Sequence, residues 1–322
     1  MDTTTRLATV ATICVGIDGS NATLDVALRP SGEPWRRTHD EAGIAEVIGR
    51  LPPLAPHVLV LEATGGWERL AVAALALAGL PGVVVHPPQV RACATATGRL
   101  AKTAALEAAA LAHCAAALRP PRRPLPDAQS QALAALVERR PQVVGRLTAE
   151  KHRWQQALPA VRATVAAHLA WLEQALAEVA GARDQLRRAS PVWHARDERR
   201  RRVPGVGPTV ARTLLAHLPA LGPGSVKHLA TLGGLAPLNR DRGAWRGSRT
   251  SWGGRRHVRA ALSRAALVGV RHHAVLRAFS AQLLARGTPQ KVALTACRHT
   301  LLTILHAVLR DCTTWQPTLL AT

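Results

Sequence analysis

The sequence predicts an α/β domain near its N-terminal end, followed by a mainly helical remainder. Short apolar runs alternate with helix-type spacing over residues 12–117. The segment RPPRRPLPD at 119–127 then interrupts the pattern, because its prolines cannot continue a helix. Helical composition returns over 142–190 and again over 260–312. Strands that alternate with helices form a layered α/β unit, whereas runs of helices form a separate helical body.

The first predicted elements form a β-hairpin. TICVGID at 12–18 has the apolar content of a buried strand, GSNA provides a turn, and TLDVALR at 23–29 shows strand alternation. The hairpin ends in the turn RPSGE, and a third strand is expected near WRRTH at 35–39.

Helices and strands then alternate. The expected elements are an amphipathic helix over 41–51, the strand HVLVL at 57–61, a helix from Trp67 to Leu80, the strand GVVV at 82–85 and helices over 89–117. Antiparallel strands followed by strand–helix alternation is the order of a ribonuclease H-like sheet. The domain boundaries expected are 10–120 for the α/β domain, 121–195 for a linker with long helices, and 196–315 for a C-terminal domain.

Two of the strands deliver a carboxylate at their C-terminal ends. Asp18 ends the strand in CVGIDGS, and Glu62 ends the strand in VLEATGGWE. An open α/β sheet places its polar chemistry in the crevice beyond its strand ends, so these acids are expected to converge. Paired carboxylates there suggest a site for a divalent metal ion.

The overall charge indicates a polyanionic partner. The 322 residues include 42 Lys and Arg against 20 Asp and Glu, a formal net charge of +22. A surplus of this size spreads over broad basic surfaces that attract nucleic acid, and it makes a phosphodiester the natural substrate of a bound metal. A GC-rich genome that inflates Arg without any ligand is the alternative explanation.

The cysteines indicate a reducing, cytoplasmic location. Their odd number, wide scatter and apolar surroundings predict neither a disulfide framework nor a zinc motif. They are Cys14, Cys93, Cys114, Cys297 and Cys312. No signal peptide and no membrane span are expected, because Gly79, Pro81 and Gly82 interrupt the most apolar stretch.

A stripe of apolar positions four and three residues apart runs through the middle of the chain. Its members are Val161, Val165, His168, Leu172, Ala175, Val179, Ala182 and Leu186. Such spacing is typical of a coiled-coil seam and predicts a dimer or tetramer. A long helix that packs inside its own subunit explains the stripe equally well.

The run RDERRRRVPGVGPTVARTLL at 196–215 places a basic patch before a Gly-containing turn and a helix. Gly205 and Gly207 allow close backbone approach, and the helix offers its N-terminal amides to an anion. Helix-hairpin-helix elements hold a DNA backbone in this way. An ordinary corner between two helices is the alternative.

A cationic, loop-rich segment spans residues 233–259. Its arginines stand against the single acid Asp241, and Trp245 and Trp252 lie among them. The arginines are Arg240, Arg242, Arg246, Arg249, Arg255, Arg256 and Arg259. Guanidinium groups on phosphates and indoles on bases predict a nucleic-acid contact surface, with a solvated charged loop as the alternative.

Several motifs in order resemble the DEDD-type transposases of insertion-sequence family one-ten. They are GID, LEATGGWE, HPPQVRACATATGRLAKTAALEAAALA, VPGVGPTVA, GGLAPLNRDRG, RGSRTSWGGRRHVRAAL and GTPQKVALTA. The resemblance implies a RuvC-like N-terminal domain, a coiled-coil middle and a C-terminal transposase domain. It also implies an enzyme that cuts and rejoins DNA strands with Mg²⁺ and a structured guide RNA.

The resemblance places four acids at Asp18, Glu62, position 104 and position 107, which implies catalytic and metal-binding roles for Asp18, Glu62 and Glu107. Ala104 occupies a position where the family has Asp, and Glu107 replaces an Asp. Three remaining acids would bind Mg²⁺ more weakly than four.

The family's serine nucleophile matches Arg242. Arginine stays protonated at any physiological pH and cannot act as a nucleophile. Ser248 and Ser251 lie in the same loop and are weak substitutes, because a nucleophile must lie in line within about 3.5 Å of the phosphorus.

Two alternatives to an active recombinase follow. One is a relative that binds nucleic acid without catalysis, which Ala104 and Arg242 favour. The other is an actin-like kinase, which GIDGS resembles, but no second phosphate loop occurs at 203–312. Zinc enzymes are excluded because His257, His272 and His273 lack partners at metal-ligand spacing.

Overall fold

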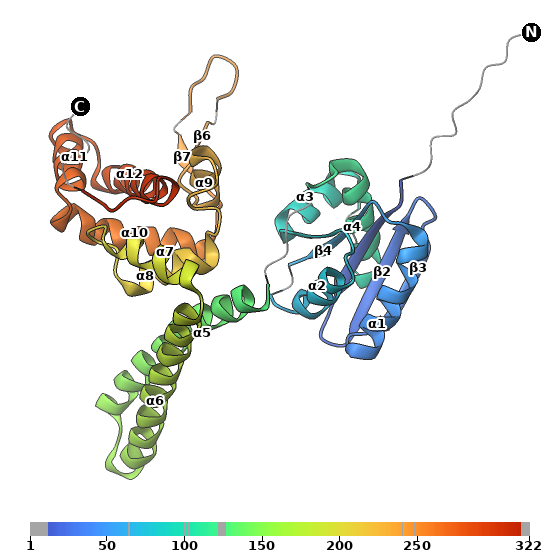
Figure 1. The fold of residues 1–322 in the computed structure, drawn as a ribbon, viewed down its shortest axis with the longest axis horizontal. Helices are drawn as coiled ribbons and strands as arrows, with labels where there is room; N and C mark the ends of the chain where they lie inside the picture. Colours follow the sequence, from blue (N-terminus) through green and yellow to red (C-terminus); the bar gives the residue numbers. More distant parts are fainter. Residues whose placement is uncertain are drawn as a thin grey trace, which may run out of the picture. The chain divides into compact units, whose positions relative to one another are not determined.

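The computed structural model describes residues 12–63, 65–99, 101, 103–121, 127–239, 241–247 and 249–316. The chain divides into two compact units, Met1–Pro126 and Asp127–Thr322. Figure 1 shows the mixed sheet of the first unit and the helices of the second. The expected mixed α/β sheet and the mainly helical remainder are confirmed.

The first unit is built on a five-stranded sheet. Its strands are β1 (Cys14–Gly19), β2 (Thr23–Arg29), β3 (Pro34–Thr38), β4 (Val58–Glu62) and β5 (Gly82–Val85). They lie in the order β3-β2-β1-β4-β5. The first three strands pair antiparallel, whereas β4 runs parallel to both β1 and β5. This is the hairpin followed by strand–helix alternation that the sequence predicts.

Helices cover both faces of this sheet. They are α1 (Glu41–Arg50), the short 3-10 turn η1 (Pro52–Leu54), α2 (Glu68–Leu77), α3 (Pro87–Ala96) and α4 (Ala104–Leu118). Val15 and Ile17 share a core with residues of α1 and α2, whereas Cys14 and Val60 share another with residues of α3 and α4. Neighbouring strand residues face opposite sides, which explains why β1 and β4 are apolar on both faces up to Asp18 and Glu62.

Gly16 positions α4 directly over β1. A Cβ atom at Gly16 would lie 2.1 Å from the carbonyl oxygen of Ala108 and 2.4 Å from the amide nitrogen of Ala112. Glycine therefore allows the helix backbone to approach the strand. Cys14 packs near Leu111 and Ala115, further along the helix. The first turn of α4 consequently lies toward the C-terminal end of β1.

One pair of cysteines contradicts the sequence expectation. Cys93 of α3 and Cys114 of α4 form a disulfide with a Cα–Cα distance of 6.2 Å. Their separation of 21 residues gives no hint of contact, because packing of α3 on α4 brings them together. Among the residues that the structure describes, Cys14, Cys297 and Cys312 are free.

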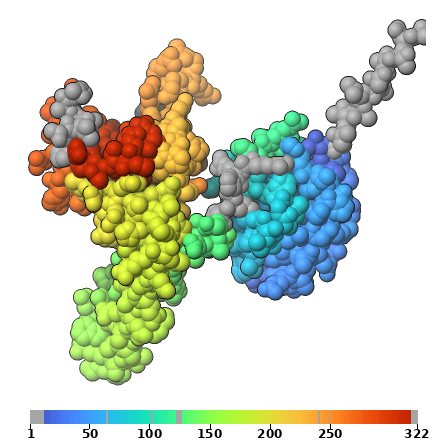
Figure 2. Space-filling view, viewed as in Figure 1, coloured from blue at the N-terminus to red at the C-terminus, as the bar shows by residue number. Residues whose placement is uncertain are grey.

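The second unit consists of helices and one small hairpin. Its helices are α5 (Ala128–Gln156), α6 (Pro159–Ala189), α7 (Pro191–Arg201), α8 (Pro208–His217), α9 (Val226–Leu232), α10 (Arg256–His272), α11 (Ala274–Ala285) and α12 (Gln290–Arg310). The hairpin strands are β6 (Pro237–Leu238) and β7 (Thr250–Ser251). In Figures 1 and 2 this hairpin, in orange, projects beyond α9. The core lies among α8, α9, α10 and α12.

The long helices α5 and α6 pack against each other within one chain. Leu186 of α6 packs near Leu133 and Val137 of α5, and Leu172 is fully buried. The break between α5 and α6 is an interruption of the helix: α5 ends at Gln156, and α6 begins with Pro159 in its first turn. Part of the predicted stripe is thus covered by the chain itself, whereas Val161 near the break is exposed.

Helix α12 is a core helix. Among the described residues it alone is long and apolar enough to cross a membrane, and half of that apolar stretch is buried inside the unit. Cys297, Leu301 and Leu305 are completely buried in the core. Such burial explains the apolar composition of the helix without a membrane.

Candidate carboxylate site and nucleic-acid interface

Asp18 and Glu62 end neighbouring parallel strands on the same side of the sheet. Ile17 of β1 pairs with Leu61 of β4, so the two acids are the next residues along each strand. Ile17 and Leu61 face α1 and α2, and the alternation of side chains turns both acids toward the face covered by α4. Neighbouring strands lie about 4.8 Å apart, so the two side chains begin from adjacent backbone positions. Asp18 is only 7% exposed.

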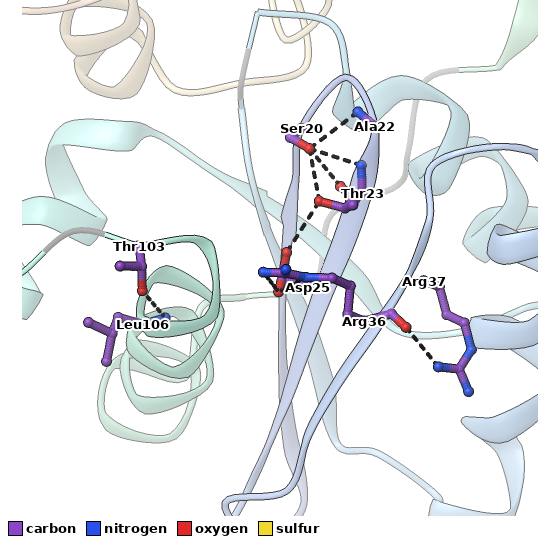
Figure 3. A network of polar contacts seen from close by, with 8 residues as sticks. All are labelled: Ser20, Ala22, Thr23, Asp25, Arg36, Arg37, Thr103 and Leu106. Atoms are coloured by element: carbon purple, nitrogen blue, oxygen red, sulfur yellow. Dashed lines mark hydrogen bonds and ion pairs between the residues drawn. The ribbon is translucent and has the colours of Figure 1, made fainter.

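A third acid, Asp25, lies opposite Asp18, and the sequence reasoning missed it. The two residues are directly paired across the antiparallel strands β1 and β2. Asp25 is 4% exposed and accepts hydrogen bonds from Nε of Arg36, at 3.0 Å, and from the hydroxyl of Thr23, at 3.4 Å. Figure 3 shows Arg36 reaching Asp25 across the strand. The alternation in TLDVALR could have identified Asp25, because it places this acid on a buried face of the strand.

The turn between β1 and β2 is fixed by Ser20. Its hydroxyl oxygen accepts from the amides of Ala22, at 3.3 Å, and Thr23, at 2.9 Å (Figure 3). The Nδ1 atom of His39 contacts the carbonyl oxygen of Ser20. The His39 ring lies 6.5 Å from the ring of Trp67, which is half exposed. An accessible indole therefore lies near the strand ends that carry the acids, and the sequence reasoning had not assigned it to the site.

The first turn of α4 carries Ala104 and Glu107. Thr103 caps this helix by accepting from the amide of Leu106 at 3.3 Å (Figure 3). Ala104 precedes Ala108 by one turn on the side that packs over β1, and it presents only a methyl group there. Glu107 accepts a hydrogen bond at 3.1 Å from Nη2 of Arg91 on α3.

The structure therefore brings Asp18 and Glu62 to one end and one face of the sheet, but it does not gather Glu107 with them. Within the described ranges, no three His, Cys, Asp or Glu side chains are grouped closely enough to hold a metal ion. Carboxylate oxygens are the ligand type that Mg²⁺ takes, and Mg²⁺ is often held by one or two of them. The strand side of the site fits such an ion, and Ala104 leaves the helix side without a ligand.

The turn between α7 and α8 contains the two predicted glycines, and they differ. Gly205 has φ +94°, and a Cβ there would lie 2.7 Å from the carbonyl oxygen of Ala265 in α10. The backbone at Gly205 thus closely approaches α10, a helix of the same unit. Gly207 precedes α8 as its N-cap, and a Cβ there would meet nothing within 4 Å. Gly207 leaves open space at the start of that helix.

Among the described residues, the arginines and tryptophans of the predicted basic segment are exposed, except for Arg259, which is partly buried. The exposed residues are Arg242, Trp245, Arg246, Arg249, Trp252, Arg255 and Arg256. Trp245 is 62% and Trp252 76% exposed. Arg240 and Ser248 lie outside the described residues. Two broad apolar rings in water beside guanidinium groups form a surface to which flat aromatic bases would bind.

Arg242 lies in the loop beyond the paired strands. Its amide donates to the carbonyl oxygen of Trp245 at 2.9 Å, and the amide of Trp245 donates back at 3.0 Å. Asp241 pairs with Arg246 at 3.0 Å. Ser251 lies in β7 opposite Pro237. The loop therefore presents a permanently charged guanidinium at the position where the family resemblance expects a serine.

Comparison with known proteins gives matches in both units. A family model for transposases of the DEDD IS110 type matches residues 15–162, and a model described as transposase IS116/IS110/IS902 family matches residues 197–281. The pilin gene-inverting protein of Moraxella bovis is 29% identical over 262 residues, which cover 79% of this chain and 80% of the relative. The Moraxella lacunata protein of the same name is 28% identical over 262 residues, with the same coverage.

Among solved structures, T. thermophilus RuvC in complex with a Holliday junction substrate is similar to part of the chain. The match has a TM-score of 0.28 and 18% sequence identity, and it covers 35% of this chain and 99% of that chain.

Proposed function

Because the chain belongs to the IS110 family of transposases, we propose that it is a DNA recombinase of a mobile insertion element with impaired strand cleavage. The observation that carries the proposal is the placement of Asp18 and Glu62 on one face at the ends of neighbouring strands. The formal net charge of +22, from 42 basic against 20 acidic residues, supports DNA as the substrate.

Asp18 and Glu62 would hold Mg²⁺, which when bound stabilises negative charge on the attacking and leaving oxygens of a phosphodiester. Arg36 neutralises Asp25 next to Asp18, so that one buried charge of the cluster is already compensated. Ala104 supplies no ligand, and Glu107 is engaged by Arg91. These features support weaker metal binding than a complete set of four acids would give.

Residues of the second unit also support impaired chemistry. The protonated guanidinium of Arg242 is not a nucleophile, and Ser251 lies within a paired strand rather than in the loop. A relative that binds nucleic acid without catalysis is therefore the second candidate function. Ala104 and Arg242 together favour it.

Binding functions complete the proposal. Trp245, Trp252 and the arginines around them would bind the bases and phosphates of DNA, and of a structured guide RNA as the family resemblance implies. The exposed Trp154, Leu158 and Val161, near the break between α5 and α6, support a homodimer or homotetramer through these helices. A cytoplasmic location is part of the proposal, and membership of the transposase family supports it in place of the cysteines, two of which form a disulfide.

Recombination of a supercoiled plasmid that carries the element ends tests the proposal. The double variant A104D/R242S restores a carboxylate and a hydroxyl. We expect it to raise recombination at least about a hundredfold, the lower end of the roughly 10²–10⁴-fold range of single catalytic groups. The control A105D/R242S places the new acid on an exposed neighbour in α4 and should stay at background. Recombination by the unaltered chain at the rate of A104D/R242S would show that Arg242 does not mark the nucleophile position.

A further inference from the structure

A cavity of about 1000 Å³ lies within the second unit. Its walls come from α5, α6, the turn between α7 and α8, the start of α8, and α10. Elements from distant parts of the sequence thus surround the cavity, which includes the open space at Gly207. A single inorganic phosphate is far smaller than this volume.

The charge of the cavity wall has one sign. Five arginines and His257 line it, and no Asp or Glu is among the lining residues. The arginines are Arg140, Arg183, Arg201, Arg256 and Arg264. Arg201 approaches the buried Asp197 at 4.0 Å. In the described part of the chain, the other four have no carboxylate within ion-pair distance.

Arg183 is the unusual member of this set. It is only 4% exposed, and its Nε donates to the carbonyl oxygen of Val179 at 3.3 Å. Burial lowers the pKa of Arg183, and the nearby Arg212 and Arg140 lower it further. Asp184 acts in the opposite direction, but this acid is shared with Arg187 and Arg212, with which it forms ion pairs. A guanidinium nevertheless stays protonated, so the protein holds a buried positive charge among other positive charges. A bound anion would relieve this unfavourable arrangement.

The remaining wall suits more than a bare anion. Apolar side chains of Val144, Val203 and Val210 line the cavity beside the arginines. Helix α8 begins at the open Gly207, and the free amides of a helix N-terminus favour negative charge. A sugar–phosphate chain combines apolar sugar carbons with phosphate oxygens, which matches both kinds of surface.

We propose that this cavity binds one segment of a DNA backbone, with a phosphate on Arg183 and sugar atoms against the valine wall. The site rests on the proposed function only in that DNA is the substrate. It reads no base, because phosphate contacts position a nucleic acid without specifying its sequence. Apart from Arg256 and His257, the residues that line it lie outside the segment 233–259 that carries Trp245 and Trp252.

Binding of a labelled DNA duplex of arbitrary sequence to the full chain, measured by fluorescence anisotropy at several salt concentrations, tests the site. We expect R183Q and R264Q each to weaken binding roughly tenfold, as loss of a charge-assisted hydrogen bond predicts. Each should also reduce the slope of log affinity against log salt by about one, the value for one phosphate contact. R188Q, an exposed arginine of the same helix as Arg183, is the matched control and should change neither quantity by more than a small amount.

R264Q separates a loss of DNA binding from a loss of folding. Arg264 is exposed, so R264Q should keep the native thermal unfolding midpoint even if R183Q does not. Binding by R264Q that matches R188Q in affinity and salt slope would overturn the site. An RNA duplex of the same sequence that loses more affinity than DNA in R264Q would overturn the assignment to DNA. Normal DNA binding by the cavity variants, together with recombination by A104D/R242S, would leave the proposed function standing without the cavity.

Discussion

The strand ends of the first unit and the β6–β7 hairpin of the second unit differ in the burial of their candidate site residues. Asp18 and Asp25 are buried, and their positions follow from strand register and from α4 resting on Gly16. Trp245 and Trp252 stand in water on a loop that is held by few strand pairs. The first region therefore depends on packing, so that mutations there should change stability, whereas mutations in the second should change binding alone.

The largest expected effect comes from filling the contact between β1 and α4. In G16V the new side chain collides with the backbone of Ala108 and Ala112, which cannot move without displacing the helix. We expect a loss of about 3 kcal/mol or more in the free energy of unfolding, at the upper end for overpacked cores. Urea unfolding followed by circular dichroism measures it.

The matched control is G49A in α1. A Cβ at Gly49 meets nothing within 4 Å, and alanine is favoured over glycine in a helix by about 1 kcal/mol. G49A should therefore leave stability unchanged or raise it slightly. Equal stability of G16V and G49A would show that α4 does not rest on β1 in solution.

An intermediate effect is expected at the exposed indoles. W245A and W252A should each weaken binding of single-stranded DNA by about 1–3 kcal/mol, the usual contribution of one stacked base. Their unfolding midpoints should match that of the parent, because both side chains are mostly exposed. Anisotropy titration and thermal unfolding measure the two quantities on the same samples. A loss of stability without a loss of affinity would show that these two indoles contribute to folding and not to DNA binding.

The smallest effect concerns pH and the core of the second unit. Burial lowers the pKa of His273 and of His306, so the native state favours their neutral forms. Their stabilisation is complete above the unfolded-state value of about 6.5 and is lost as the pH falls below it. Thermal midpoints should therefore decrease between pH 7 and pH 5.

The variant H273N isolates one of these histidines. Nδ1 of His273 accepts from the amide of Leu276 at 3.4 Å as the cap of α11, and asparagine also caps helices but does not titrate. We expect a shallower dependence of the midpoint on pH in H273N than in the parent. H272N, at the exposed neighbour, should retain the parental dependence. A parental slope in H273N would mean that His273 takes up its proton equally in the native and unfolded states over this range.

The sequence by itself determined the mixed sheet, its hairpin and the helices that follow, because apolar periodicity and turn residues are local properties. It also placed Asp18 and Glu62 at strand ends, since a carboxylate after a buried apolar run has one natural position in an open sheet. The basic segment at 233–259 was visible in the same way, whereas the break between α5 and α6 before Pro159 was not predicted. The predicted features need no knowledge of distant contacts.

Only the tertiary structure decided the partners of these residues. The pairing of Asp25 with Asp18, the engagement of Glu107 by Arg91 and the disulfide between Cys93 and Cys114 depend on which elements meet in space. The same holds for the approach of Gly205 to α10 and for the arginines that surround Arg183. Sequence spacing carries no information about such contacts, because packing of distant elements sets the distances between their side chains.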